Sequence, residues 1–129
     1  MGFLGRQPAA PATTKQRGDA AEDAALRHLT AAGLRLLARN YRTPGRGGGE
    51  IDLILGAPDG TLVFVEVRQR SRADHGGAGA SIGAAKRARI VLAARHYLLR
   101  WASPPPCRFD VVLVEPGGLR WLPAAFDAD

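Results

Sequence analysis

Near the middle of the chain, two short apolar segments carry charged residues at alternate positions: GEIDLI and FVEVRQR. Each has the length of a strand, and the residues between them include Pro58, Asp59 and Gly60, which favour a tight turn. The pattern therefore predicts an antiparallel hairpin. If Asp59 stands at the centre of the turn, Asp52 lies opposite Glu66.

The side chains of a strand alternate between its two faces, and this alternation predicts one apolar and one charged face for the hairpin. The apolar face consists of Ile51, Leu53, Val63, Val65 and Val67. The other face consists of Glu50, Asp52, Ile54, Phe64, Glu66, Arg68 and Arg70.

The two carboxylates that oppose each other on the charged face suggest a metal site. Such carboxylates repel and raise each other's proton affinity unless a cation lies between them. A divalent ion at Asp52 and Glu66 explains the pattern. The alternative is a surface ladder of ion pairs with Arg68 and Arg70, which contributes little to stability.

The other elements follow from helical spacing and from turn residues. Helices are predicted at 18–32 and 84–101, and strands at 34–42, 107–115 and 119–122. The connections include a glycine-rich loop at 43–49 and a polar loop at 71–83. Residues 1–17 are rich in alanine, proline and threonine, which predicts a disordered basic tail before a single domain at 18–129. The order is αβββαββ, that of an α/β protein.

Glu22 falls on the apolar stripe of the first predicted helix. It shares helical spacing with Ala25, Leu26 and Leu29, whereas Asp23 lies on the solvated side. A glutamate that points inward needs a partner. The alternative is a surface position, because an alanine-rich helix has weak periodicity.

The charge of the chain favours a polyanionic partner such as nucleic acid. Its 129 residues suit one domain, and 18 Lys+Arg against 12 Asp+Glu give a net charge of +6 and a pI near 10.7. The sequence has no apolar run of about 18 residues and no secretory leader pattern, which predicts a cytoplasmic protein without a membrane span.

Cys107 is the one cysteine, so an internal disulfide and a thiolate zinc site are excluded, and we expect it to be buried. The histidines show no ligand spacing; they are His28, His75 and His96.

Three further features each have two interpretations. The loop Gly45–Gly49 could cradle a phosphate, but it lacks the lysine and hydroxyl residue of a P-loop and precedes a strand, so a flexible connection is expected. The basic residues of the second helix would follow a phosphate backbone if they lie near the carboxylates, and would otherwise form a solvated face. Asp110 could be a structural partner or a residue of the site, and we do not count it among the catalytic residues.

Several short motifs together match one family. They are Gly18 and Glu22, Asn40-Tyr41-Arg42, Gly49-Glu50-Ile51-Asp52-Leu53-Ile54, Phe64-Val65-Glu66-Val67 with Arg70, Lys86-Arg87, and Arg108-Phe109-Asp110-Val111. On these residues, the chain from Gly18 to Phe126 resembles the bacterial YraN family of uncharacterised proteins, which is similar to PD-(D/E)xK nucleases and to archaeal Holliday-junction resolvases. The resemblance implies a restriction-endonuclease-like core with a mixed central sheet flanked by helices. It also implies action on DNA or RNA and suggests a homodimer.

The resemblance also implies roles for particular residues. In such nucleases, carboxylates hold Mg²⁺ or Mn²⁺, which activates a water molecule. Asp52, Glu66 and Glu22 would be metal ligands and catalytic residues, and Glu50 would be a further ligand or a supporting residue. Arg70 would orient the carboxylates. The residues expected to contact nucleic acid are Arg70, Lys86, Arg87 and Arg89.

Arg68 departs from the nuclease pattern, which has lysine at this position. Arginine supplies charge and hydrogen bonds but does not release a proton near neutral pH. We therefore expect Arg68 to act as a catalytic residue that faces phosphate, or to neutralise Glu50 or Glu66. Lys86 could reach the site as a migrated lysine.

The sequence leaves three functions open. The first is a metal-dependent phosphodiester hydrolase that acts on nucleic acid. The second is a catalytically inactive nucleic-acid-binding module that acts with a partner in DNA processing. The third is a dimerising scaffold without nucleic acid, which would show no salt-dependent DNA affinity.

Overall fold

The computed structural model describes residues 10–70 and 82–128 of the chain. The elements within these residues are α1 (Thr14–Ala31), β1 (Arg35–Arg42), β2 (Glu50–Gly56), β3 (Leu62–Gln69), α2 (Ala84–Leu98), β4 (Cys107–Glu115) and β5 (Gly118–Phe126). Their order, αβββαββ, is the predicted one. Residues 1–9 of the predicted tail lie outside the described residues. So does most of the predicted loop at 71–83, including His75.

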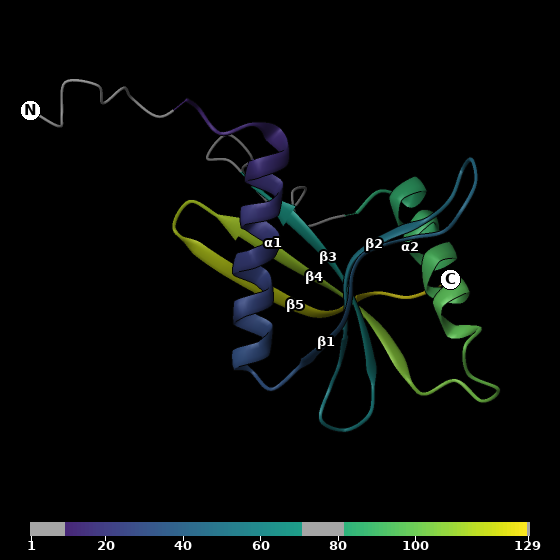
Figure 1. Cartoon of the computed structure of the whole chain (residues 1–129). Coiled ribbons are helices and arrows are strands. Elements are labelled where there is room, and N and C mark those ends of the chain that lie inside the picture. The colour runs from purple at the N-terminus through teal and green to yellow at the C-terminus, as the bar shows by residue number, and fades with distance from the viewer. Residues whose placement is uncertain (1–9, 71–81, 129) are drawn as a thin grey trace, which may run out of the picture.

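The strands form one mixed sheet in the order β1-β2-β3-β4-β5. β3 and β4 run parallel and are joined by the crossover that contains α2, whereas the other neighbouring strands are antiparallel. The two helices pack on opposite faces of the sheet (Figure 1). The predicted mixed sheet flanked by helices is confirmed, and the arrangement is compatible with a restriction-endonuclease-like core.

The hairpin of β2 and β3 has the predicted register. Leu53 pairs with Val65, and the turn is closed by Asp59, whose carboxylate accepts a hydrogen bond from the amide of Thr61 at 3.0 Å. One residue beyond this ladder, the same register brings Asp52 opposite Glu66.

Both faces of the hairpin are apolar over its middle, which corrects the prediction of one charged face. Leu53 and Val65 pack in the core under α1, whereas Ile51, Ile54 and Phe64 pack in the core under α2. A sheet covered by helices on both sides requires apolar side chains on both sides. Ile51, which alternation had placed on the same face as Leu53, packs instead with Ile54 in the core under α2.

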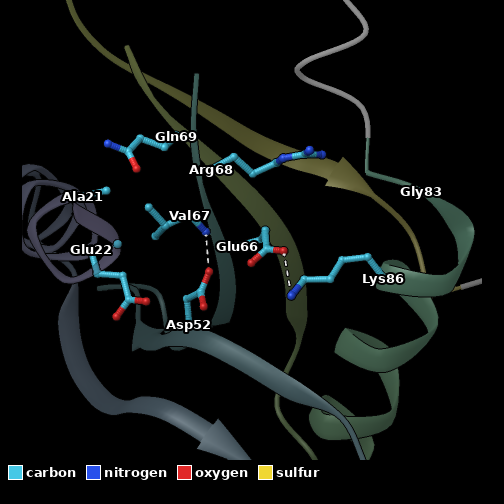
Figure 2. Close-up of a pocket in the computed structure, with 10 residues that line it drawn as sticks. Ala21, Glu22, Asp52, Glu66, Val67, Arg68, Gln69, Gly83 and Lys86 are labelled. Atoms are coloured by element: carbon cyan, nitrogen blue, oxygen red, sulfur yellow. Dashed lines mark hydrogen bonds and ion pairs between the residues drawn. The ribbon is translucent and has the colours of Figure 1, made fainter. Parts of the chain in front are cut away.

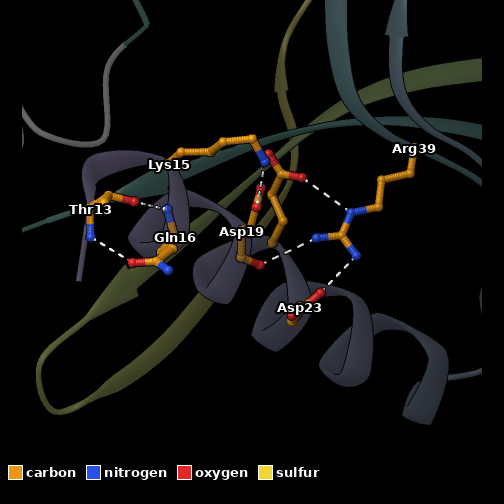
Figure 3. Close-up of polar contacts among 7 residues, drawn as sticks. Thr13, Lys15, Gln16, Asp19, Asp23 and Arg39 are labelled. Carbon is orange, nitrogen blue, oxygen red and sulfur yellow. Dashed lines mark hydrogen bonds and ion pairs between the residues drawn. The ribbon is translucent and has the colours of Figure 1, made fainter. Parts of the chain in front are cut away.

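α1 begins at Thr14, four residues before the predicted start, so residues 14–17 belong to the helix and not to a tail. The reason is a capping box (Figure 3). The hydroxyl of Thr13 accepts a hydrogen bond from the amide of Gln16 at 3.1 Å, and the side chain of Gln16 accepts one from the amide of Thr13 at 2.8 Å. An ion pair between Lys15 and Asp19 follows in the first turns.

β5 extends to Phe126, beyond the predicted strand at 119–122, because Asp110 forms a hydrogen bond with its C-terminal half. Asp110 is fully buried, and its carboxylate accepts hydrogen bonds from Trp121 Nε1 at 2.9 Å and from the amide of Ala124 at 2.9 Å. Arg108 Nε donates to the same carboxylate at 3.0 Å. Of the two roles that the sequence left open for Asp110, its contacts support the structural one.

α2 ends at Leu98, three residues before the predicted end, but its buried face is the predicted one. Ile90, Ala94 and Tyr97 are buried, and Trp101 packs against the same core. Cys107, which we expected to be buried, is exposed at the first residue of β4. Neither of the described helices is both long and apolar enough to cross a membrane.

Candidate nuclease-like site

A pocket of about 470 Å³ lies where β2 and β3 extend between the N-terminal parts of the two helices (Figure 2). Its lining consists of Gly18, Ala21, Glu22, Asp52, Glu66, Val67, Arg68, Gln69, Gly83 and Lys86. The fold thus brings together Glu22, Asp52 and Glu66, three of the four predicted metal ligands.

The position of Asp52 follows from the end of the β2–β3 ladder. Leu53 pairs with Val65, and one residue further on, the side chain of Asp52 accepts a hydrogen bond from the backbone amide of Val67 at 2.8 Å. This hydrogen bond to a backbone amide of β3 holds the carboxylate of Asp52 in place in the lining of the pocket.

Glu66 is buried beside Asp52 and has an unusual electrostatic environment. The residue is 7% exposed. Burial, together with a hydrogen bond to Asp52 and the charge of that carboxylate, raises the pKa of Glu66 to about 9. Glu66 therefore keeps its proton near neutral pH.

Lys86, in the first turn of α2, reaches the carboxylates from the opposite side of the pocket (Figure 2). Its Nζ lies 3.4 Å from Oε2 of Glu66 and 3.2 Å from Oε1 of Glu50. Burial lowers the pKa of Lys86, but the charges of Glu66 and Glu50 outweigh this effect and raise it overall. The pocket therefore contains an ammonium group at the carboxylate pair, as expected of a migrated lysine.

Glu22 points toward the pocket from α1 and has the partner that an inward glutamate needs. Nε of Arg39 on β1 lies 3.2 Å from Oε1 of Glu22. The same guanidinium donates to Asp23 at 2.7 Å and to the carbonyl of Asp19 at 3.3 Å (Figure 3). Burial and the charge of Asp52 raise the pKa of Glu22, although Arg39 opposes the shift. Arg39 was not predicted from the sequence. The inward position of Glu22 indicated that it needs a partner, but not which residue would be that partner.

Glu50 lies outside the lining of the pocket and is surrounded by cations. Besides Lys86, it contacts Arg89 at 3.3 Å and Arg42 at 3.7 Å. These three cations lower the pKa of Glu50, against the effect of its partial burial. Glu50 is therefore placed to hold basic side chains in position next to the pocket.

The other predicted basic residues lie at four different locations. Arg68 lines the pocket, but its side chain extends away from Asp52 in Figure 2. Arg70 follows β3, where its amide donates to the carbonyl of Val114 at 2.9 Å. Arg89 lies beside Glu50, whereas Arg87 lines a separate groove along the outer side of α2. Lys86 and Arg89 are thus the basic residues of α2 that the fold places near the carboxylates.

Comparison with known proteins places the chain in a family. The profile described as Uncharacterised protein family UPF0102 matches residues 21–114. The chain belongs to UPF0102. This finding confirms the resemblance to the YraN family.

Relatives described as UPF0102 proteins cover nearly all of the chain. One from Paracidovorax citrulli is 70% identical over 99% of this chain and 99% of its own length. One from Albidiferax ferrireducens is 72% identical over 90% of this chain and 91% of its own. One from Cupriavidus pinatubonensis is 58% identical over 95% of this chain and 94% of its own.

The part of the chain that matches the UPF0102 profile includes the carboxylates and the lysine of the pocket, from Glu22 to Lys86. Within residues 10–70 and 82–128, no three His, Cys, Asp or Glu side chains lie close enough together to bind one metal ion on their own. Asp52 and Glu66 nevertheless offer two adjacent carboxylates, which suits Mg²⁺, because this ion often takes one or two carboxylates and completes its shell with water and substrate phosphate. Glu22 is the third oxygen donor in the lining, and its ion pair with Arg39 holds it on the α1 side.

Proposed function

We propose that this UPF0102 protein binds nucleic acid in the cytoplasm and hydrolyses its phosphodiester bonds with Mg²⁺ or Mn²⁺. The observation that carries the proposal is the buried Glu66, which lies beside Asp52 and faces Lys86 in an open pocket. A buried carboxyl group whose pKa is raised next to a second carboxylate is an energetically costly arrangement, and such perturbed groups in a cleft are typical of functional sites.

Asp52 and Glu66 would hold the metal ion, and Glu22, which Arg39 keeps on the α1 side, would face the ion through a bound water. The bound ion would offset the charge of the scissile phosphate and lower the pKa of a bound water. Asp52 is kept in place by the amide of Val67, so it needs no rearrangement to act as a ligand. Glu66 would release its proton when the ion binds, because a cation favours the charged form of a carboxyl group.

Lys86 takes the role that the nuclease pattern gives to a lysine on the strand. Its ammonium group, 3.4 Å from Glu66, supplies the positive charge next to the carboxylates. Arg68, two residues after Glu66 on β3, would contact a flanking phosphate, for which the planar guanidinium is well suited. The net charge of +6 supports a polyanionic substrate.

The test is cleavage of labelled single-stranded, duplex, flap and four-way-junction DNA, and of the corresponding RNA, in Mg²⁺ and in Mn²⁺. We expect Asp52→Asn and Lys86→Gln each to reduce cleavage at least about 100-fold while binding is retained, since electrostatic stabilisation of the transition state is worth this much. Asp59→Asn in the hairpin turn is the matched control and should cleave like the wild type. Equal cleavage by the wild type and Asp52→Asn would contradict the proposal.

A second candidate is a nucleic-acid-binding module without catalysis, which acts with a partner protein. It is favoured by Arg68 at the lysine position and by the contact of Lys86 with Glu50, which competes for the ammonium group. Salt-dependent binding by the wild type without cleavage of any substrate would favour this candidate. A gain of cleavage in Arg68→Lys would show instead that the wild type is a damaged enzyme.

A further inference from the structure

A second cavity, of about 300 Å³, lies on the other side of Glu50 from the pocket of Asp52 and Glu66. It is lined by Arg42 from β1, Arg89 from α2, Thr43, Glu50 and the glycines of the loop 45–49. The loop, expected from the sequence to be a flexible connection, therefore forms one wall of a cavity with an arginine on each side.

The loop is held against α2 by close packing at Gly49. A Cβ atom on Gly49 would lie 2.1 Å from the carbonyl oxygen of Arg89 and 2.7 Å from the amide nitrogen of Ala93. The loop is closed by two hydrogen bonds, from the amide of Gly49 to the hydroxyl of Thr43 at 2.7 Å and from the amide of Thr43 to the carbonyl of Gly49 at 3.0 Å. The position of Arg89 next to the loop is thus fixed by backbone contact.

The backbone of the loop has the left-handed conformation that occurs in anion-binding nests. Gly45 has φ 89° and Gly47 has φ 68°. Nests with residues of positive φ bind phosphate oxygens through their backbone amides, and these two glycines give the loop the backbone freedom that such a nest requires.

The charge around the cavity is positive. Arg42, Arg89 and Lys86 all contact the single carboxylate of Glu50, at 3.7, 3.3 and 3.2 Å. Of these residues Arg42, Arg89 and Glu50 line the cavity, so its lining has a net charge of +1. The side chains of Arg42 and Arg89 are 75% and 51% exposed, so both can turn donors toward a ligand while Glu50 keeps them in place.

We propose that this cavity binds a phosphate of the nucleic-acid strand next to the phosphate bound at Asp52 and Glu66. The inference rests on the proposed function and adds the path of the substrate. Lys86 lies between the two sites, because it contacts Glu66 on one side and Glu50 on the other. The strand therefore runs from the carboxylate pocket over the first turns of α2 to the glycine loop, and the substrate is a polynucleotide.

The test is binding of fluorescent oligothymidylate and oligouridylate of about 12 nucleotides, a length within the usual site size of single-strand binders. Binding is measured without divalent metal ions at several salt concentrations, with the double variant Arg42→Gln/Arg89→Gln. We expect about tenfold weaker binding and a salt slope lower by about 0.7, since the loss of one phosphate contact on a single strand removes about that much. The use of both oligonucleotides shows whether the site prefers DNA or RNA.

The matched control is Arg95→Gln/Arg120→Gln, which removes the same charge from exposed positions of α2 and β5 that line neither pocket. We expect the slope of this variant to equal that of the wild type. Thermal melting checks folding, and the single variant Arg42→Gln alters a largely exposed side chain, so its fold is not at risk. An unchanged slope in the loop variant, or equal losses in both double variants, would overturn the inference.

The same titration separates this inference from the proposed function. If the wild type binds and Asp52→Asn loses cleavage while the loop variant keeps the full slope, the second phosphate site is wrong and the nuclease proposal survives. If the wild type shows no salt-dependent affinity for either oligonucleotide, the proposed function fails, and the phosphate site fails with it.

Discussion

Asp110 and Glu66 are both buried carboxylates in adjacent strands of one sheet, but their surroundings differ. Asp110 accepts hydrogen bonds from Arg108, Trp121 and the amide of Ala124. Glu66 meets Asp52, a second acceptor, and opens onto a pocket. A buried carboxylate with donors on every side is a structural partner, whereas one that faces another carboxylate retains the capacity to bind a cation.

The two carboxylates have different surroundings because their positions along the paired strands differ by one residue. β3 and β4 run parallel, with Val65 beside Asp110 and Glu66 beside Val111. Because side chains alternate, the two carboxylates lie on opposite faces of the sheet. Asp110 faces the side of α1 and the end of β5, and Glu66 faces the lysine of α2.

Asp110→Asn should cause the largest loss of stability, about 3 kcal/mol. The substitution removes a charge-assisted partner of Arg108 and places an amide donor against the donors of Trp121 and Ala124. Urea denaturation measures the free energy of unfolding. Asp52→Asn, the same substitution at the pocket, should change this value by less than about 1 kcal/mol, because its oxygen can still accept from Val67 and its amide can donate to Glu66. Equal losses at the two sites would remove the distinction.

Glu66→Gln should stabilise the protein by about 2 kcal/mol at pH 8 in the absence of metal ions. The pKa of Glu66 is about 9 in the folded state against an ordinary value of 4.5, so the folded state keeps a proton that the unfolded state loses as the pH rises above 4.5. The stability of the wild type should therefore fall between about pH 4.5 and pH 9, by up to about 1 kcal/mol per pH unit.

The measurement for Glu66 is urea denaturation from pH 5 to pH 8 in a chelating buffer. The variant should lack the part of the pH dependence that Glu66 contributes. Parallel pH curves for the wild type and Glu66→Gln would show that the side chain is ionised in the fold. Asp110→Asn should keep the slope of the wild type.

Magnesium should raise the free energy of unfolding of the wild type by about 1 kcal/mol at pH 8, at a concentration about five times the Kd. The shift should be smaller at pH 5, where protons compete more strongly with the ion for Glu66. Asp52→Asn should lose it and Asp110→Asn should keep it. Differential scanning fluorimetry in Mg²⁺ and in chelator follows these shifts, and an equal shift in all three proteins would place the ion elsewhere.

Arg39→Gln should have the smallest effect, a loss of about 0.5 kcal/mol, because its ion pairs with Glu22 and Asp23 are partly exposed. The substitution should raise the pKa of Glu22 further, since Arg39 favours its charged form. Carbon-detected NMR titration of the Glu22 carboxyl group measures this directly. A lower pKa in the variant would mean that Arg39 does not govern Glu22.

The elements and the hairpin register could be predicted from the sequence because they depend on local signals. Pro58 and Gly60 fix the turn, and alternation then sets Asp52 opposite Glu66 without knowledge of the rest of the chain. The charged face was predicted wrongly because alternation does not reveal what covers a face, and here α2 covers Ile54 and Phe64.

The partners in the site could not be predicted in the same way. Arg39 meets Glu22 because β1 crosses beside α1, and Arg89 meets the glycine loop because Gly49 allows the backbone of the loop to touch α2. Such contacts join residues that are far apart along the chain, and no periodicity of the sequence encodes them.

The order of the elements, the family and the opposed carboxylates of the hairpin could all be predicted without a structure, since they follow from spacing along one stretch of chain. The cations next to those carboxylates depend on how the helices pack on the sheet. The tertiary structure brought Lys86 to Glu66, turned Arg68 away from Asp52 and placed Arg42 and Arg89 around Glu50. The reason is that the range of an ion pair is a few ångströms, and the packing of α1 and α2 on the sheet sets distances on that scale.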